Sequence, residues 1–184
     1  RLPSNDTIAK EILNNIGNTK TKVVLDKDIK NSYYVYLRDT IYISNKEKNN
    51  NFHRCCLVAH ECVHSIQSKV IQKINFCLSN IELALFVLIA IISFFIKLNA
   101  IMYFYFAFCI VSIIPRLYLE LDAIRGSIRL SRAYLEKKLK KQECEKMIDI
   151  YTTQIRILLP FSFLSLFFGK IIRCLLIFFL MFII

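Results

Sequence analysis

Two long apolar blocks dominate the pattern of hydrophobic and polar positions along this chain. The first covers residues 81–115 and is interrupted only by Glu82, Lys97, Asn99 and two serines. Its length suits a helical hairpin of two membrane spans, each near the lower end of the ~17–25 residues that a bilayer requires. We expect a transmembrane hairpin and not a soluble core, because too few polar residues remain to cover such a core.

The second block covers residues 157–184 and is less regular. Its apolar arms are short on either side of a polar break at residues 169–173. One tilted span, a re-entrant hairpin and two short helices are all compatible with this pattern. Together, the two blocks predict three to four transmembrane helices.

The residues before the first block alternate between helical and strand-like patterns. Apolar positions between Ile8 and Ile16 recur at helical spacing, with Ser4 or Asp6 as the cap and Gly17 as the stop. Runs rich in Val, Ile, Tyr and Thr predict the strands of a small sheet at residues 22–25, 33–37 and 40–44. An edge of that sheet could bind an extended peptide as an added strand.

Two further helices are expected, at residues 52–73 and from Pro115 to Lys141. The fold class is therefore α+β and mostly helical. Four segments follow: residues 1–80 with the sheet and the helix at 52–73, the hairpin 81–115, a charged helical segment 116–156, and the membrane segment or segments 157–184. Because the chain begins at Arg1 and not at methionine, we expect it to be a piece of a longer protein, with an anchor helix upstream as one possibility.

Positive charge is concentrated beside the apolar blocks. The net charge is +11, and of 25 Lys and Arg residues, 12 lie in residues 1–80 and 10 in residues 116–156. A hairpin places both basic segments on one side of the membrane, and the positive-inside rule makes that side cytoplasmic. Nucleic-acid binding is disfavoured because no basic–aromatic motif accompanies the charge, whereas attraction to anionic lipid explains it simply. Seven cysteines without a C-x-x-C pair do not form a disulfide framework and fit a reducing compartment.

The candidate chemistry lies in an H-E-x-x-H sequence within the helix expected at residues 52–73. Side chains four residues apart share one helix face, so His60 and His64 can bind the same metal ion. Glu61 lies beside His60 and could take a proton from the attacking water. Zinc is the expected metal, since it accepts two imidazoles and a carboxylate and keeps a fourth position for water.

The third ligand is expected from the helix that follows the hairpin. Glu120 shares a helix face with two small residues, Ala123 and Ser127, which would let another helix approach closely. Asp122 is the main competitor and could instead orient a ligating imidazole. Other candidates fit less well: His53 lies about 10 Å from His60 along the helix, and Cys56 would require three consecutive turns to reach one ion.

The residues from Val58 to Gln67 resemble the metal motif A-A-H-E-V-G-H-A-I-Q of the YugP-like membrane zinc metallopeptidases, also called neutral zinc metallopeptidases. Residues 120–127 are similar to that family's E-x-D-A-S-x-x-A motif, and the match places Glu120 at the third ligand of HtpX-type relatives. Residues 32–36 and 41–44 resemble the D-H-Y-D-P and V-x-L-S motifs. The resemblance covers nearly the whole chain and implies a zincin-like fold.

The chain also departs from the family pattern. Only Tyr34 of D-H-Y-D-P is present, so no role of that motif's His or Asp is carried over. Val63 replaces a small Gly in the metal helix, and Ile124 replaces a small polar residue. Bulk at these positions implies that the two helices pack differently, although no proposed ligand is lost.

The leading hypothesis is an integral-membrane zinc endopeptidase with its site at the cytoplasmic membrane boundary. His60, His64 and Glu120 would bind zinc, Glu61 would act as general base, and Tyr34 is a candidate for stabilising the oxyanion. Peptides or membrane proteins would be its substrates. The alternative hypothesis is a non-catalytic membrane scaffold that keeps the metal-binding helix and binds a partner or lipid.

Overall fold

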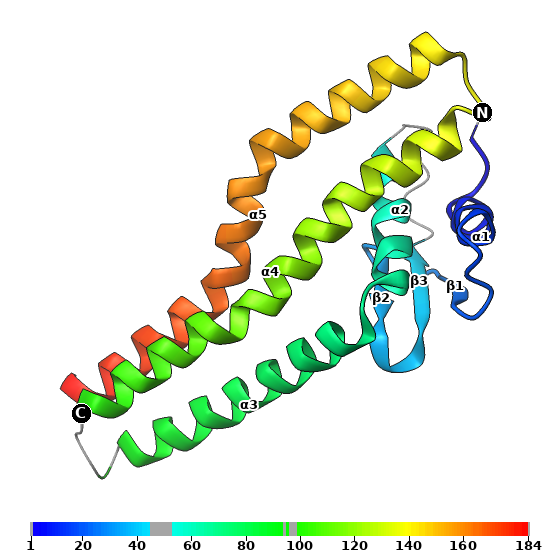
Figure 1. Ribbon diagram of the computed structural model, residues 1–184. Helices are drawn as coiled ribbons and strands as arrows, with labels where there is room; N and C mark the ends of the chain where they lie inside the picture. Colours follow the sequence, from blue (N-terminus) through cyan, green and yellow to red (C-terminus); the bar gives the residue numbers. More distant parts are fainter. Residues whose placement is uncertain (1, 45–52, 94, 96–98, 184) are drawn as a thin grey trace. The chain divides into compact units, whose positions relative to one another are not determined.

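The described residues form long helices and one small sheet (Figure 1). The computed structural model describes residues 2–44, 53–93, 95 and 99–183. The elements are α1 (Asn5–Asn15), β1 (Lys22–Asp26), β2 (Tyr33–Val35), the 3-10 helix η1 (Tyr36–Arg38), β3 (Thr40–Ser44), α2 (His53–Ile66), α3 (Lys69–Ser93), α4 (Asn99–Leu135) and α5 (Lys141–Ile183). The expected class, mostly helical with a small sheet, is confirmed.

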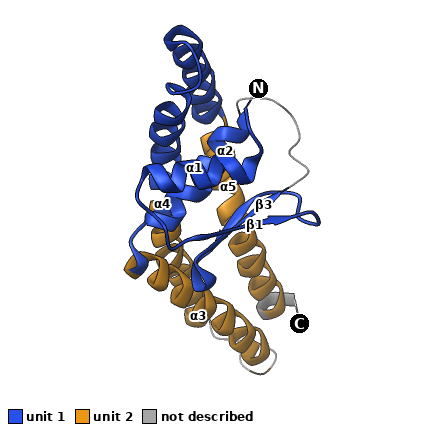
Figure 2. Ribbon diagram, turned by 90° about the vertical axis from the view of Figure 1, so that its right-hand side faces the viewer, with its two compact units in different colours: residues 1–69, 119–157 blue, residues 70–118, 158–184 orange. Residues whose placement is uncertain are grey.

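The chain divides into two compact units (Figure 2). Unit 1 contains residues 1–69 and 119–157, and unit 2 contains residues 70–118 and 158–184. The sheet, α1, α2, the C-terminal part of α4 and the N-terminal part of α5 belong to unit 1. Unit 2 is built from the most apolar parts of α3, α4 and α5.

The sheet has β3 at its centre, in the order β1-β3-β2. β3 pairs in parallel with β1 and antiparallel with β2. Its Ile41 and Ile43 are completely buried, as expected for a strand with a neighbour on both sides. All three predicted strands are confirmed, but residues 36–38 form a 3-10 turn and not the end of a strand. Asp39, at φ 43°, then leads the chain into β3.

Helix α1 packs into the core of unit 1 through the apolar positions that predicted it. It ends as expected just before Gly17, which has a φ of 73°. That conformation is accessible to glycine at little cost. Ser4 stands at the N-cap position, as one of the two predicted caps. The shared core contains Ile8, Ala9, Ile12, Leu13, Ile41, Ile43, Cys55, Val58, Ala59 and Cys62.

Helix α2 has one buried face and one partly exposed face. Cys55, Cys56 and Cys62 are fully buried on the first as free thiols, and His60 and His64 are partly exposed on the second. A helix face buried against a core thus places the two imidazoles at the edge of that core.

The expected helix over residues 52–73 is wrong in its length. Phe52 lies outside the described residues, α2 ends at Ile66, and α3 starts at Lys69. Two residues separate the helices, and the first of them, Gln67, is held by side-chain hydrogen bonds to α4. Tertiary contacts of this kind outweigh local helix propensity, and the sequence pattern reports only that propensity.

Helix α4 does not begin at Pro115, as the sequence had predicted, but at Asn99. Proline is favoured in the first turn of a helix, and this preference gave the wrong start. Inside a helix, proline removes one backbone hydrogen bond. In an apolar environment the other backbone groups have no partner outside the helix, so the helix continues. Glu120 therefore lies on the same helix as the second arm of the hairpin.

Helix α5 resolves the three possibilities for the C-terminal block. It is one helix of 43 residues that continues through Pro160. The re-entrant hairpin and the pair of short helices are therefore wrong. One long helix satisfies the backbone donors and acceptors within the segment, apart from the hydrogen bond that Pro160 removes.

Three helices, α3, α4 and α5, are long and apolar enough to cross a membrane. Only 17%, 22% and 6% of the residues in their most apolar windows are buried within the protein. The remaining apolar side chains face outward, which is typical of helices that contact lipid and not water. The described residues thus contain three candidate membrane-spanning helices, within the range of three to four expected from the sequence.

The packing of α2 against α4 depends on Gly126. A Cβ atom at this position would lie 2.7 Å from Cγ2 and 2.9 Å from Cγ1 of Val63. Ala123 and Ser127, the small residues predicted to allow a close approach, are completely buried. Val63 is thus accommodated by a missing side chain on the facing helix, which explains how a bulkier residue fits in the metal helix.

We expect Gly126→Ala to destabilise unit 1. Overpacking typically costs about 1–3 kcal/mol, which exceeds the roughly 1 kcal/mol that alanine contributes through helix propensity. Val63→Ala should restore the space, so that the double variant unfolds at a higher temperature than Gly126→Ala alone. Thermal unfolding in detergent tests this. Gly169→Ala is the control, because the nearest atom to a Cβ there is Nη1 of Arg173, at an ordinary contact distance of 4.0 Å. Equal melting temperatures for the two glycine variants would contradict the prediction.

Candidate metal centre

Three potential metal ligands from two helices meet in unit 1. His60 and His64 come from α2 and Glu120 from α4. Nε2 of His60 lies 3.1 Å from Nε2 of His64 and 3.4 Å from Oε2 of Glu120. Nε2 of His64 lies 3.9 Å from the same carboxylate oxygen. The sequence predicted these three residues as ligands, and the structure brings them together.

These separations suit a small cation with tetrahedral coordination. Ligand atoms bound at about 2.0–2.1 Å in a tetrahedron are about 3.3 Å apart. The three observed distances scatter around that value. The side chains are 16% to 31% exposed, so solvent reaches the group. The group could therefore hold a metal ion and leave one position for a water or a substrate atom.

Gln67 fixes the orientation of His64. Its side-chain Nε2 donates hydrogen bonds to the backbone carbonyl of Leu119, at 2.7 Å, and to Oδ2 of Asp122, at 2.8 Å. The amide oxygen of Gln67 must then face Nδ1 of His64, which lies 2.8 Å away. Nδ1 therefore carries the proton, and the lone pair of Nε2 points into the site, as metal binding requires.

The electrostatic environment of the group favours a positive charge. Burial lowers the pKa of His60, but the hydrogen bond to Glu120 and the negative charges of Glu61 and Glu120 outweigh it, so the pKa is raised. The pKa of His64 is lowered by burial and by the charge of His60. The carboxylates of Glu61 and Glu120, which raise the pKa of His60, would also attract a cation bound between the imidazoles.

Glu61 lies outside the ligand group but close to it. Its side chain is partly buried, and its charge affects the pKa of His60. A carboxylate beside the ligands without binding the ion is the position that a general base requires. Whether Glu61 acts in this way stays a prediction.

Two of the weaker candidates lie apart from the site. His53 is exposed, and its ring contacts that of Tyr151 with the centroids 5.9 Å apart. Cys56 is buried in the core. Within the described parts of the chain, neither belongs to the group of possible metal ligands.

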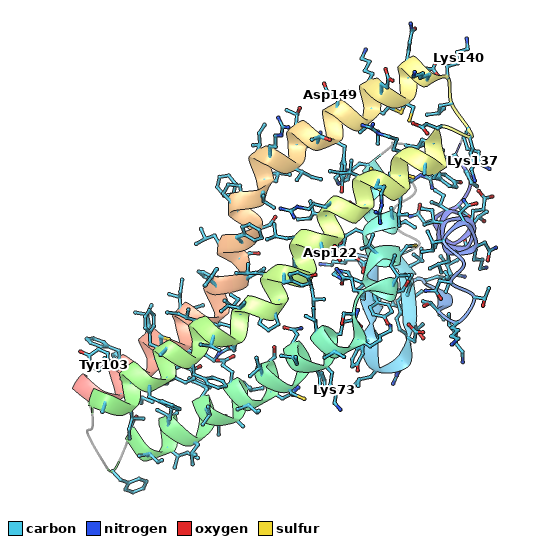
Figure 3. The ribbon with its side chains drawn as sticks, viewed as in Figure 1. Lys73, Tyr103, Asp122, Lys137, Lys140 and Asp149 are labelled. Atoms are coloured by element: carbon cyan, nitrogen blue, oxygen red, sulfur yellow. The ribbon has the colours of Figure 1, made fainter. Side chains whose placement is uncertain are left out.

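Asp122 lies on α4 (Figure 3) and contacts Gln67. It does not belong to the ligand group but accepts a hydrogen bond from Gln67. The sequence predicted, as the alternative role, that the carboxylate of Asp122 orients a ligating imidazole. Asp122 contacts His64 only through Gln67 and not directly. Sequence reasoning missed Gln67 as the intervening residue, although its position three residues after His64 was a usable signal.

Tyr34, the candidate for stabilising an oxyanion, has other partners. Its hydroxyl donates a hydrogen bond of 2.7 Å to Oδ1 of Asp39 and accepts one of 2.5 Å from Nζ of Lys69. Burial and the neighbouring Asp39 raise the pKa of the Tyr34 phenol. The cluster links the sheet to the start of α3, and the catalytic role of Tyr34 stays a prediction.

No protein-family model, curated protein or solved structure matches the chain. The assignment of a metal centre therefore depends on the residues described above.

We expect Gln67→Leu to weaken metal binding by about 10–100-fold, because removal of a hydrogen-bond partner of a ligating imidazole has effects of that size. Isothermal titration of the metal-free protein with Zn²⁺ measures the change. Gln142→Leu is the control, since Gln142 is exposed on α5. An unchanged affinity in Gln67→Leu would show that His64 keeps its orientation without the amide.

Proposed function

We propose that this chain is an integral-membrane zinc endopeptidase with a zincin-like arrangement of its metal-binding helices. The observation that carries the proposal is the convergence of two imidazole nitrogens and one carboxylate oxygen at tetrahedral separations, in a group that solvent reaches. Two His and one Glu with an open position form a ligand set of catalytic, not structural, zinc sites. The resemblance to the YugP-like metallopeptidases supports the same conclusion.

Bound zinc would lower the pKa of a water molecule to about 7 and polarise the substrate carbonyl. Glu61 accepts the proton of the attacking water on its carboxylate and delivers it to the leaving amine nitrogen. Gln67 and Asp122 keep His64 in the tautomer whose Nε2 carries no proton. Gln67 and Asp122 thus orient a ligand, and Glu61 transfers a proton.

We further propose that the site lies on the cytoplasmic side of the membrane and acts on membrane proteins or peptides. The basic segments that flank the apolar hairpin support this placement, because they would remain on the positively biased side. The sheet offers two edge strands, β1 and β2, where an extended substrate could pair.

The ligand assignment predicts that His60→Ala, His64→Ala and Glu120→Ala each abolish stoichiometric zinc binding. Loss of one of three protein ligands leaves too few donors for a stable site. Elemental analysis of the purified full chain measures the zinc content. Asp122→Ala is the comparison variant, and it should retain zinc with weaker affinity. Full occupancy after loss of His60 would end the proposal.

The catalytic assignment predicts a different result for Glu61→Gln: zinc is retained and cleavage of an unfolded protein such as casein falls by at least about 100-fold, because general base catalysis contributes 10²–10⁴-fold. Glu145→Gln, at an exposed position of α5, is the matched control. If neither wild type nor variant cleaves any substrate while both bind zinc, the alternative of a non-catalytic membrane scaffold is favoured.

A further inference from the structure

A charged cluster lies among the apolar helices of unit 2. Glu82 of α3 is only 2% exposed. Its carboxylate accepts two hydrogen bonds from the guanidinium of Arg173, at 3.0 and 2.9 Å, and one from Nζ of Lys170, at 3.0 Å. The hydroxyl of Tyr105 donates a further one, at 2.5 Å. Ionisable residues on membrane helices are costly and usually serve a function.

The cluster contains more positive than negative charge. One carboxylate faces two cations, Lys170 and Arg173. Lys170 also donates a hydrogen bond to Oγ of Ser112, at 2.9 Å, which is a neutral partner. A structural ion pair would need only one of the two cations. The second cation remains without a compensating negative charge in the described part of unit 2.

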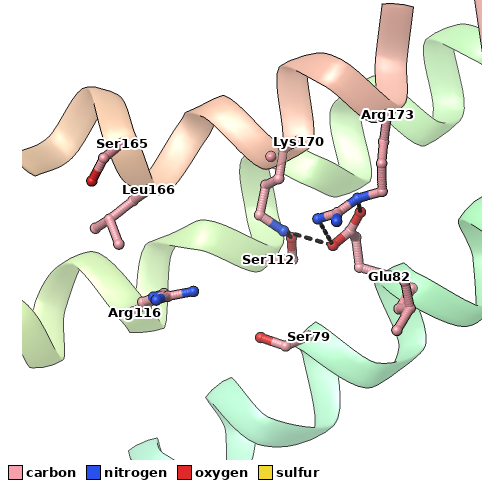
Figure 4. A pocket seen from close by; sticks show the side chains of 10 residues that line it. Ser79, Glu82, Ser112, Arg116, Ser165, Leu166, Lys170 and Arg173 are labelled. Carbon is pink, nitrogen blue, oxygen red and sulfur yellow. Dashed lines mark hydrogen bonds and ion pairs between the residues drawn. The ribbon is translucent and has the colours of Figure 1, made fainter. Parts of the chain in front are cut away.

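A cavity of about 380 Å³ adjoins this cluster, with a third cation in its wall. Figure 4 shows Arg116 of α4 pointing into the space beside Lys170 and Ser79. Within the described residues, Arg116 forms no ion pair. Three cations and one carboxylate thus line the cavity, together with the hydroxyl of Ser79 as a donor. The hydroxyl of Ser112 donates to the carbonyl of Cys109 and accepts from Lys170. Guanidinium, ammonium and hydroxyl groups around an open space are the donors that bind phosphate.

For two of its three helices, the cluster also lies at one end of the apolar run: the run of α3 follows Glu82, and that of α4 ends just before Arg116. In α5, Lys170 and Arg173 lie in the polar break between two short apolar arms. In a bilayer, charged groups at the ends of apolar runs lie at the level of the lipid headgroups. Leu83 and Leu166 complete the cavity wall as apolar neighbours for an acyl chain.

We propose that this cavity binds the phosphate group of an anionic phospholipid, with a phosphomonoester such as phosphatidic acid as the preferred class. Two excess positive charges match the one to two negative charges of a phosphomonoester. Basic pockets between membrane helices bind lipid headgroups in this way. The proposal rests on the proposed membrane placement and is independent of the peptidase assignment.

Native mass spectrometry of the full, delipidated chain in neutral detergent tests the proposal. We expect one phosphatidic acid per chain to be retained, with weaker retention of phosphatidylglycerol and none of phosphatidylcholine. Arg116→Gln should reduce retention of phosphatidic acid at least tenfold without lowering the melting temperature, because Arg116 takes no part in the Glu82 contacts. Lys73→Gln removes a charge from an exposed position of α3 outside the cavity and should leave retention unchanged.

Inorganic phosphate distinguishes the source of the group. If phosphate at millimolar concentration displaces the lipid in wild type but not in Arg116→Gln, the cavity recognises the phosphate group itself. Binding of phosphate without lipid would assign the free anion as the ligand. Equal retention of phosphatidic acid by wild type and Arg116→Gln, or equal losses in Arg116→Gln and Lys73→Gln, would overturn the site. Flotation with vesicles at alkaline pH tests membrane placement separately, and zinc content tests the metal centre.

Discussion

The close contact between α2 and α4 is the constraint on which the candidate metal centre depends. Two imidazoles on one helix can only offer two ligands, and the third must come from a helix that approaches within the reach of a glutamate side chain. Val63 would keep the helices apart if the facing position had a Cβ atom, and Gly126 removes that obstacle. The buried Ala123 and Ser127 continue the same narrow face, so that Glu120 arrives beside His60 and His64.

Much of this site was predictable because its determinants are local. His60 and His64 are four residues apart in the sequence, which places them on one helix face. Glu120 was identified by the small residues that follow it. The pairing of Val63 with Gly126 was not predictable, since it depends on which residues of two distant segments face each other. The end of α2 at Ile66 was missed for the same reason: the hydrogen bonds of Gln67 to α4 are tertiary contacts.

The fold shows the same division. Apolar runs predicted three to four membrane helices, and three helices are long and apolar enough to cross a membrane. This prediction succeeded because every residue of such a helix contributes to its apolar composition. Local preferences failed where a single residue had two possible roles. Pro115 is favoured at a helix start but is tolerated within an apolar helix, and α4 follows the second course. For α5, composition alone gave three solutions, and the continuous helix is the one that leaves few backbone groups without a partner despite Pro160.

The buried face of α2 has a consequence for metal selectivity. Cysteine thiolates bind zinc more strongly than most donors, and three cysteines lie on the same helix as the imidazoles. Burial raises the pKa of Cys55 and of Cys56 to about 12, and raises that of Cys62 as well. Almost none of these sulfur atoms is ionised at neutral pH, so they cannot compete for the ion or capture a softer one such as copper(I). A single helix thereby separates sulfur from nitrogen ligands by solvation alone.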